Sequence, residues 1–175
     1  MEIILIPDPL NPTSGSMYVG QDVFDCALGR GGFSRAKQEG DGTTPLGRFA
    51  LRRVLYRGDR VTKPKTGLPI TALRHTDGWC DDADDPLYNQ PVTHPYMANA
   101  ERLWREDNRY DVIVVLGHND NPVIVGAGSA IFLHVAAKYF RPTEGCVAMQ
   151  HNDLIDVLSQ CEPGDTINIR LVRDA

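Results

Sequence analysis

The chain has 175 residues, a formal net charge of −5 at pH 7 and 42% hydrophobic residues. A length of this order supports one folded domain with a sizeable core, so we expect residues 1–175 to form a single domain. The acidic balance argues against nucleic-acid binding and against binding to anionic membranes. No apolar run approaches the roughly 20 residues of a membrane-spanning helix.

The N-terminal sequence M-E-I-I-L-I-P-D-P predicts a first strand over residues 3–6, stopped by Pro7 and Pro9. It lacks the basic region and the longer apolar segment of a secretory signal. We therefore expect a cytoplasmic location, or a periplasmic one if a leader precedes this sequence. Residues 16–28 predict two short strands around Gly20-Gln21.

The middle of the chain alternates between short strands and polar loops. Residues 29–32, G-R-G-G, predict a plain turn, since neither G-x-G-x-x-G spacing nor a following helix marks a phosphate loop. Residues 49–56 alternate as a strand does. Residues 78–95 predict a long irregular loop, which we interpret as a solvated acidic segment because its four aspartates lack the order of a calcium loop. Residues 98–107 are a candidate short helix.

The last third of the chain completes the expected fold. The continuous apolar run 111–116 predicts a central strand covered on both faces, and residues 129–135 predict the next strand. Residues 151–160 predict an amphipathic helix capped by Asn152, followed by a closing strand over residues 166–172. The fold class predicted is mainly β with few helices (α+β), with a curled or barrel-like sheet.

Residues 129–149 carry the candidate chemistry. His134 points to the face opposite Leu133 in an alternating run, and a polar connection then leads back to Gly145-Cys146. A thiol reacts as its thiolate, and a neighbouring imidazole is the usual means of forming one at neutral pH. The remaining cysteines show no C-x-x-C spacing and are expected to be reduced and mostly buried: Cys26, Cys80 and Cys161.

Three blocks in this order resemble the L,D-transpeptidase catalytic-domain family (YkuD-like). They are G-D-G-T-T-P-L-G-R-F at residues 40–49, similar to the family's T-P-x-G-x-F, the strand histidine His134, and T-E-G-C-V-A-M at residues 143–149, similar to its [S/T]-x-G-C block. The resemblance covers residues 3–172. It implies a mostly β catalytic fold and a cysteine acyl enzyme acting on peptidoglycan stem peptides or muropeptides.

By this resemblance, Cys146 attacks the carbonyl of the third stem residue and expels the terminal D-alanine, with His134 as general base. The backbone N–H groups of Gly145 and Cys146 are then expected to form an oxyanion hole. Two positions depart from the family pattern. Glu144 replaces the usual histidine, so we expect it either to pair with Lys138 or Arg141 or to face the substrate's amine.

The second departure is Ala148, which stands where the family often has a substrate-binding arginine. Arg141 is expected to take that role, or else Arg30 or Arg35. Thr143 and Glu144 are further candidates for substrate binding. His118 either lines the same pocket or caps a turn.

No metal or organic cofactor is implied, because thiol chemistry needs none and no two histidines lie at zinc-ligand spacing. Resolution of the thioester by water would make the protein an L,D-carboxypeptidase of peptidoglycan recycling, which is the function we expect. Resolution by an amine would make it an L,D-transpeptidase. The remaining alternative is an inactive module that binds muropeptides.

Overall fold

The structure is a computed structural model, and it describes residues 1–172. It has one α-helix, α1 (His151–Leu158), and one 3-10 turn, η1 (Lys138–Phe140), within that range. The strands in chain order are β1 (Glu2–Pro7), β2 (Ser14–Val19), β3 (Asp22–Ala27), β4 (Phe33–Ser34), β5 (Thr44–Pro45), β6 (Gly47–Tyr56), β7 (Ile70–Ala72), β8 (Asp77–Cys80), β9 (Pro91–Thr93), β10 (Ala100–Arg102), β11 (Val112–Leu116), β12 (Phe132–Val135), β13 (Val147–Met149) and β14 (Thr166–Ile169).

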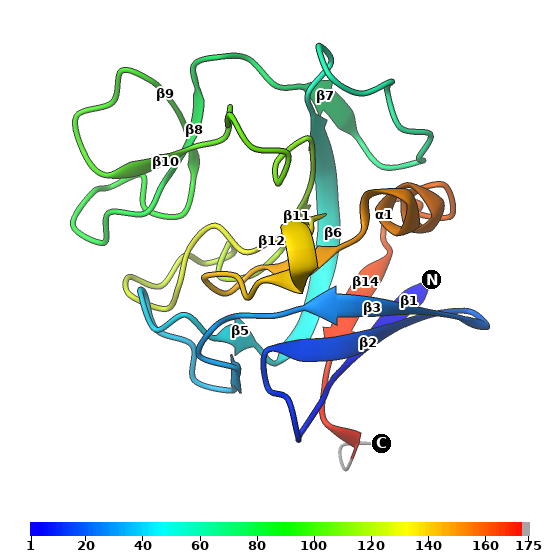
Figure 1. The fold of residues 1–175 in the computed structure, drawn as a ribbon. Coiled ribbons are helices and arrows are strands. Elements are labelled where there is room, and N and C mark those ends of the chain that lie inside the picture. Colours follow the sequence, from blue (N-terminus) through cyan, green and yellow to red (C-terminus); the bar gives the residue numbers. More distant parts are fainter. Residues whose placement is uncertain (173–175) are drawn as a thin grey trace.

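A closed β-barrel forms the body of the protein (Figure 1). Its strands follow the order β11-β12-β13-β3-β2-β1-β14-β6, and β6 pairs back with β11, so that eight strands close into a ring. β7 adds to β6 outside the ring. The predicted fold class, mainly β with a barrel-like sheet, is confirmed.

The barrel strands show the predicted alternation of faces. Val112, Val114 and Leu116 of β11 face the main core, whereas Ile113 and Val115 join a second apolar cluster on the other face. The continuous apolar run therefore belongs to a strand that is covered on both sides, as predicted. The two strands predicted around Gly20-Gln21 are β2 and β3, which pair antiparallel, and the closing strand ends at Ile169.

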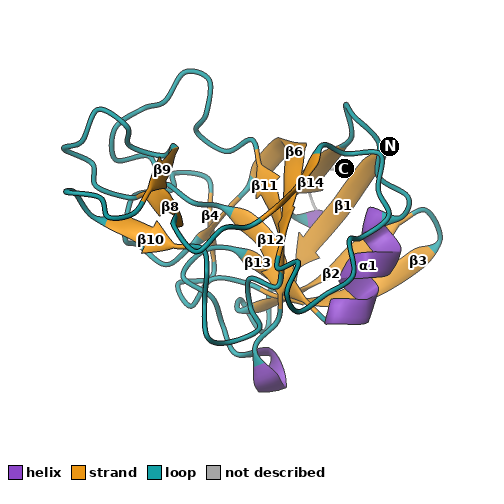
Figure 2. Ribbon diagram, turned by 90° about the horizontal axis from the view of Figure 1, so that it is seen from above, coloured by secondary structure: helices purple, strands orange, loops and turns teal. Residues whose placement is uncertain are grey.

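The second apolar cluster is covered by a small sheet that the sequence analysis missed. β10, β8 and β9 form a three-stranded antiparallel sheet beside the barrel (Figure 2). The predicted irregular loop 78–95 thus contains strand structure, and the predicted helix 98–107 is wrong. Ala100 pairs with Cys80 and Glu101 with Trp79. A run this short gains little as an isolated helix, so cross-strand pairing decides its conformation.

The helix α1 packs against the barrel with Leu154, Val157 and Leu158 buried, as its periodicity predicted. Its predicted N-cap, Asn152, is wrong. Only Gln150 separates the helix from the end of β13, so the helix begins at His151, and the cap Gln150 makes no side-chain capping bond. Within residues 1–172, no helix is long and apolar enough to cross a membrane.

Candidate active site

A cavity of about 580 Å³ opens beside β12 and β13 and is lined by both His134 and Cys146. The two strands run parallel with Leu133 opposite Val147 and His134 opposite Ala148. Because side chains alternate along a strand, residue 146 projects on the same face as His134. The loop that separates the two residues in sequence therefore brings them to one cavity, as predicted.

The Cys146 thiol is almost completely buried at the cavity wall. Its Sγ donates to the carbonyl oxygen of Ala130 at 3.2 Å and accepts a hydrogen bond from the Phe132 N–H at 3.4 Å. The single thiol proton is thus directed at Ala130 in this resting arrangement. Transfer of this proton to His134 would require the thiol to turn away from Ala130, and catalytic hydrogen bonds often form only in the substrate complex.

The orientation of His134 is set by a backbone contact. Its Nδ1 lies 2.9 Å from the carbonyl oxygen of Val135. A carbonyl accepts only, so Nδ1 carries the proton and Nε2 of the neutral ring is a free base. The Tyr110 ring contacts the imidazole edge to face, with the centroids 5.2 Å apart. The imidazole is therefore held on two sides.

Burial keeps both groups neutral at rest. It raises the pKa of Cys146 to about 12, with a further upward contribution from the charge of Glu101. Burial also lowers the pKa of His134 to about 4, against the upward effect of its bond to Val135. A thiolate–imidazolium pair is thus disfavoured before substrate binds. The attack by Cys146 that the family resemblance implies would therefore need the proton to move in the same step, as in general-base catalysis.

The turn before Cys146 is fastened by Thr143. Its hydroxyl donates to the carbonyl oxygen of Cys146 at 2.6 Å and accepts the Gly145 N–H at 3.1 Å. Gly145 has φ +133°, and a Cβ there would lie 2.8 Å from the carbonyl oxygen of Thr43. Only glycine fits this close approach of two backbones. Thr143 therefore shapes the turn that precedes Cys146.

The segment 40–49 lies against the same turn. Thr44 is fully buried, accepts the Gly29 N–H at 2.8 Å and donates to the carbonyl oxygen of Cys146 at 3.5 Å. The first and third blocks of the sequence pattern are thus in contact, although about a hundred residues separate them. A cysteine on a braced turn beside a strand histidine, with this loop beneath it, is the arrangement expected of the resembled family.

The comparison with protein families agrees with this geometry. A family model described as YkuD, the L,D-transpeptidase catalytic domain, matches residues 12–169. The chain belongs to the YkuD family. No curated protein and no solved structure matched the chain. Members of the family are cysteine-dependent L,D-transpeptidases that act on peptidoglycan stem peptides.

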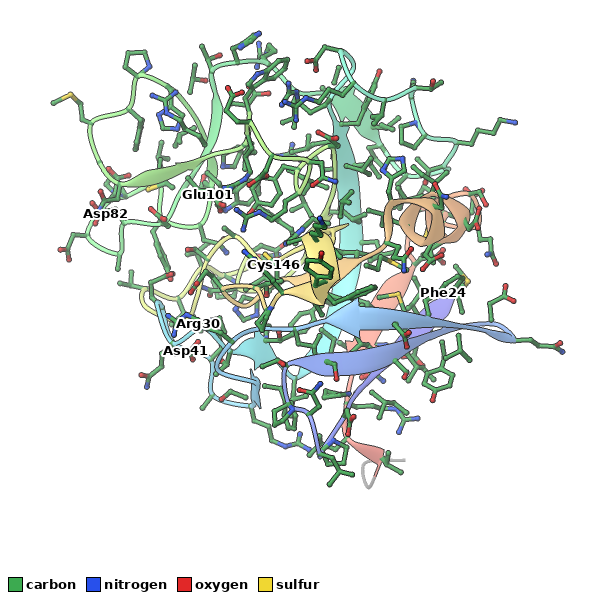
Figure 3. The ribbon with its side chains drawn as sticks, viewed as in Figure 1. Phe24, Arg30, Asp41, Asp82, Glu101 and Cys146 are labelled. Atoms are coloured by element: carbon green, nitrogen blue, oxygen red, sulfur yellow. The ribbon has the colours of Figure 1, made fainter. Side chains whose placement is uncertain are left out.

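Glu144, which departs from the YkuD pattern, pairs with a residue that was not the expected partner. Arg30 Nε donates to the Glu144 carboxylate at 2.7 Å, in place of the expected Lys138 or Arg141. The adjacent Gly29 forms a parallel bridge with Thr143. Residues 29–32 are thus a turn, as predicted, but one that also supports the active-site loop. Figure 3 shows Arg30 below Cys146.

His118 lies outside the cavity of the YkuD nucleophile. It lines a second cavity of about 410 Å³, which contains neither His134 nor Cys146. Its Nε2 contacts the carbonyl oxygen of Ala127 at 2.9 Å. Of the two interpretations left open, this position favours holding the loop between β11 and β12 over substrate binding.

The small sheet brings an acidic side chain to the cavity that sequence reasoning missed. Glu101 of β10 accepts a hydrogen bond from the Tyr110 hydroxyl at 2.6 Å, and both residues line the cavity. Burial raises the pKa of Glu101, against the opposing effects of Tyr110 and Arg105. In Figure 3, Glu101 lies on the small-sheet side of Cys146. No local signal marks Glu101, because it reaches the cavity only through the pairing of β10 with β8.

Basic side chains also line the cavity, and Arg105 Nη1 lies 3.9 Å from Glu101 Oε1. Arg105 and Arg109 both bind Asp107, at 2.8 and 2.7 Å, and Lys138 and Arg141 follow along the β12–β13 connection. These residues accompany Thr143 and Glu144, so three of the four predicted substrate-binding residues reach the cavity.

Position 148, where the YkuD family often has arginine, is closed to substrate in this chain. Ala148 is fully buried between His134 and Ala27 on the neighbouring strands. A cationic group for the substrate's carboxylate must therefore come from elsewhere on the cavity wall. Within residues 1–172, no three His, Cys, Asp or Glu side chains are grouped so as to hold a metal ion.

Proposed function

We propose that the protein is an L,D-carboxypeptidase, in which Cys146 removes the terminal D-alanine of peptidoglycan tetrapeptide stems through a thioester. The observation that carries this proposal is the placement of Cys146 and His134 on one face of parallel strands, at a single cavity, in a chain of the YkuD family.

The proposed reaction needs only a thiol, a base and water. Cys146 Sγ attacks the carbonyl carbon of the third stem residue while its proton passes to His134 Nε2. Collapse of the tetrahedral intermediate breaks the C–N bond, and Nε2 returns the proton to the leaving amine of D-alanine. Water then attacks the thioester and gives one proton to Nε2. The C–S bond breaks, that proton returns to Sγ, and the tripeptide leaves as its carboxylic acid, which loses the second proton to solvent.

The oxyanion of the intermediate is expected at the backbone N–H groups of Gly145 and Cys146. The Gly145 N–H is already engaged by the Thr143 hydroxyl at 3.1 Å. Its use in catalysis therefore requires that this bond be weakened or shared. Thr143 is thus proposed as a residue that positions the oxyanion hole.

The charged cavity wall suits a peptide that carries both charges. Arg141, Arg105 and Arg109 are proposed to face the D-alanine carboxylate, in place of the arginine that the family often has at position 148. Glu101, whose carboxylate lies 3.9 Å from Arg105, is proposed to face an ammonium group of the stem.

Water as acceptor requires only one peptide site at the thiol, whereas a cross-linking enzyme brings two peptides to it. Transpeptidation remains the second candidate because the family performs it. The cytoplasmic location stays a prediction.

The test is to incubate the purified protein with a disaccharide-tetrapeptide, with and without excess D-methionine, and to weigh the products. We expect tripeptide and free D-alanine under both conditions. A product in which D-methionine replaces D-alanine would show a transpeptidase instead. Binding of the tetrapeptide with no product under either condition would show an inactive binding module.

A further inference from the structure

A buried lysine in the cavity wall has no part in the mechanism above. The Lys37 side chain is 5% exposed, and its Nζ binds the Asp41 carboxylate at 2.5 Å and the carbonyl oxygen of Gln38 at 2.9 Å. A lysine is almost never buried to this extent unless its charge is used or paired. An ammonium has three N–H groups, so one remains beyond these two bonds.

Two glycines from distant segments make room for the lysine stem. A Cβ at Gly128 would lie 2.8 Å from Lys37 Cγ, and one at Gly145 would lie 3.5 Å from Lys37 Cε. The stem thus runs between the loop that precedes β12 and the turn that precedes Cys146. Both glycines have positive φ, +95° and +133°, so neither position readily accepts a side chain. The ammonium end of Lys37 is thereby placed beside the nucleophile's turn.

The charge of Asp41 does not simply cancel that of Lys37. Its carboxylate also accepts hydrogen bonds from the Gln38 and Thr43 N–H groups, both at 2.8 Å, and from the Thr43 hydroxyl at 2.9 Å. Although burial raises its pKa, these bonds and Lys37 bring the pKa of Asp41 to about 2. Asp41 therefore stays ionised and anchors Lys37, while part of its charge is stabilised by the loop itself.

We propose that Lys37 is the cation that stabilises negative charge on Cys146, acting through space from its slot between Gly128 and Gly145. This rests on the proposed role of Cys146 as nucleophile. The field of Lys37 favours the thiolate, whereas burial and Glu101 oppose it. In a buried site such a field is little screened by solvent. Other titratable groups around Cys146 and Lys37 include Glu39, Asp41, Asp81, Glu101, Arg105, Tyr110, His118, His134 and Glu144.

The test measures the alkylation rate of Cys146 by iodoacetamide from pH 7 to pH 9, quantified by mass spectrometry of the Cys146 peptide. Only the thiolate reacts, so at pH values below the pKa the rate follows the thiolate fraction. We expect Lys37→Met and Lys37→Gln to slow alkylation roughly tenfold at each pH, which corresponds to a rise of about one unit in pKa. Lys37→Arg keeps the positive charge, so we expect it to slow alkylation less than the two neutral variants do.

Lys138→Met is the matched control, because Lys138 also lines the cavity but is exposed on η1. We expect it to alkylate at the wild-type rate. Circular dichroism establishes which variants are folded. A wild-type alkylation rate in either folded neutral variant would overturn the proposal, as would an equal slowing in the Lys138 control. Alkylation needs no peptide substrate, so this result is independent of whether tetrapeptide is cleaved.

Discussion

His134, the proposed general base, shows how burial sets the protonation state of a side chain. The imidazole is 4% exposed, its Nδ1 proton is bound by Val135, and burial lowers its pKa to about 4. At neutral pH it therefore stands ready to accept a proton at Nε2, as a general base must. The pKa of Cys146, raised by burial to about 12, means that the base is needed at the moment of attack.

This state of His134 predicts a specific pH dependence of stability. The folded pKa lies below the unfolded value of about 6.5, so as pH falls between these values the unfolded chain takes up a proton that the folded chain does not. The free energy of unfolding should therefore decrease on acidification, by about 2 kcal/mol from this residue between pH 7 and pH 5. Urea unfolding at both pH values measures the change.

The variant His134→Asn isolates this contribution, since it removes the titrating ring. We expect its free energy of unfolding to vary less between pH 7 and pH 5 than that of the wild type. His75→Asn, which replaces an exposed histidine, should keep the wild-type dependence. An identical pH dependence in His134→Asn and wild type would show that the folded protein does not hold this imidazole neutral.

At the scale of elements, the site depends on a loop that contributes no reacting atom. The loop 40–49 places Thr44 beneath the Gly145–Cys146 turn and brings Asp41 to Lys37. Its threonines suit this function, because their hydroxyl groups bind backbone atoms of neighbouring turns. The loop thus fixes the position of the nucleophile.

The Thr44 hydroxyl offers a direct test of this support. Thr44→Val keeps the shape of the side chain but leaves the buried Gly29 N–H without its acceptor, which should cost about 1–3 kcal/mol of stability. We also expect D-alanine release from tetrapeptide to slow, because the Cys146 carbonyl loses a partner. Urea unfolding and a steady-state assay measure the two effects. Thr71→Val, at an exposed position of β7, is the control and should change neither quantity. If Thr44→Val matched this control in both stability and D-alanine release, the Thr44 hydroxyl would not support the turn.

The residues of the site that were predicted from the sequence are those marked by a local pattern. His134 lies in an alternating run and Cys146 directly follows a glycine, so a few neighbouring residues were enough to identify each. Lys37, Glu101 and Tyr110 were missed, because each reaches the cavity through contacts between segments far apart in sequence.

The helix predicted over residues 98–107 failed for the same reason. Its residues have good helix propensity, but pairing with β8 outweighs propensity in so short a segment. Glu101 consequently projects from a strand of the small sheet rather than from a helix.

In the molecule as a whole, the barrel and the small sheet contribute different parts of the site. The barrel supplies the rigid face that carries His134 and Cys146, and the small sheet with the segment after it supplies charged side chains for one wall of the cavity. Figure 2 shows the small sheet standing beside the barrel, on the side opposite α1. A catalytic pair on rigid strands, walled by shorter elements, is typical of enzymes that vary their substrates by changing those walls.

The central claim is that Cys146 forms the acyl enzyme, and release of D-alanine from a disaccharide-tetrapeptide tests it most directly. We expect the wild type to release D-alanine and Cys146→Ala to lose at least about a thousandfold in rate, since no other group replaces the nucleophile. Cys161→Ala, which removes a buried thiol at the end of α1, should retain wild-type release. Undiminished release of D-alanine by folded Cys146→Ala would contradict the account.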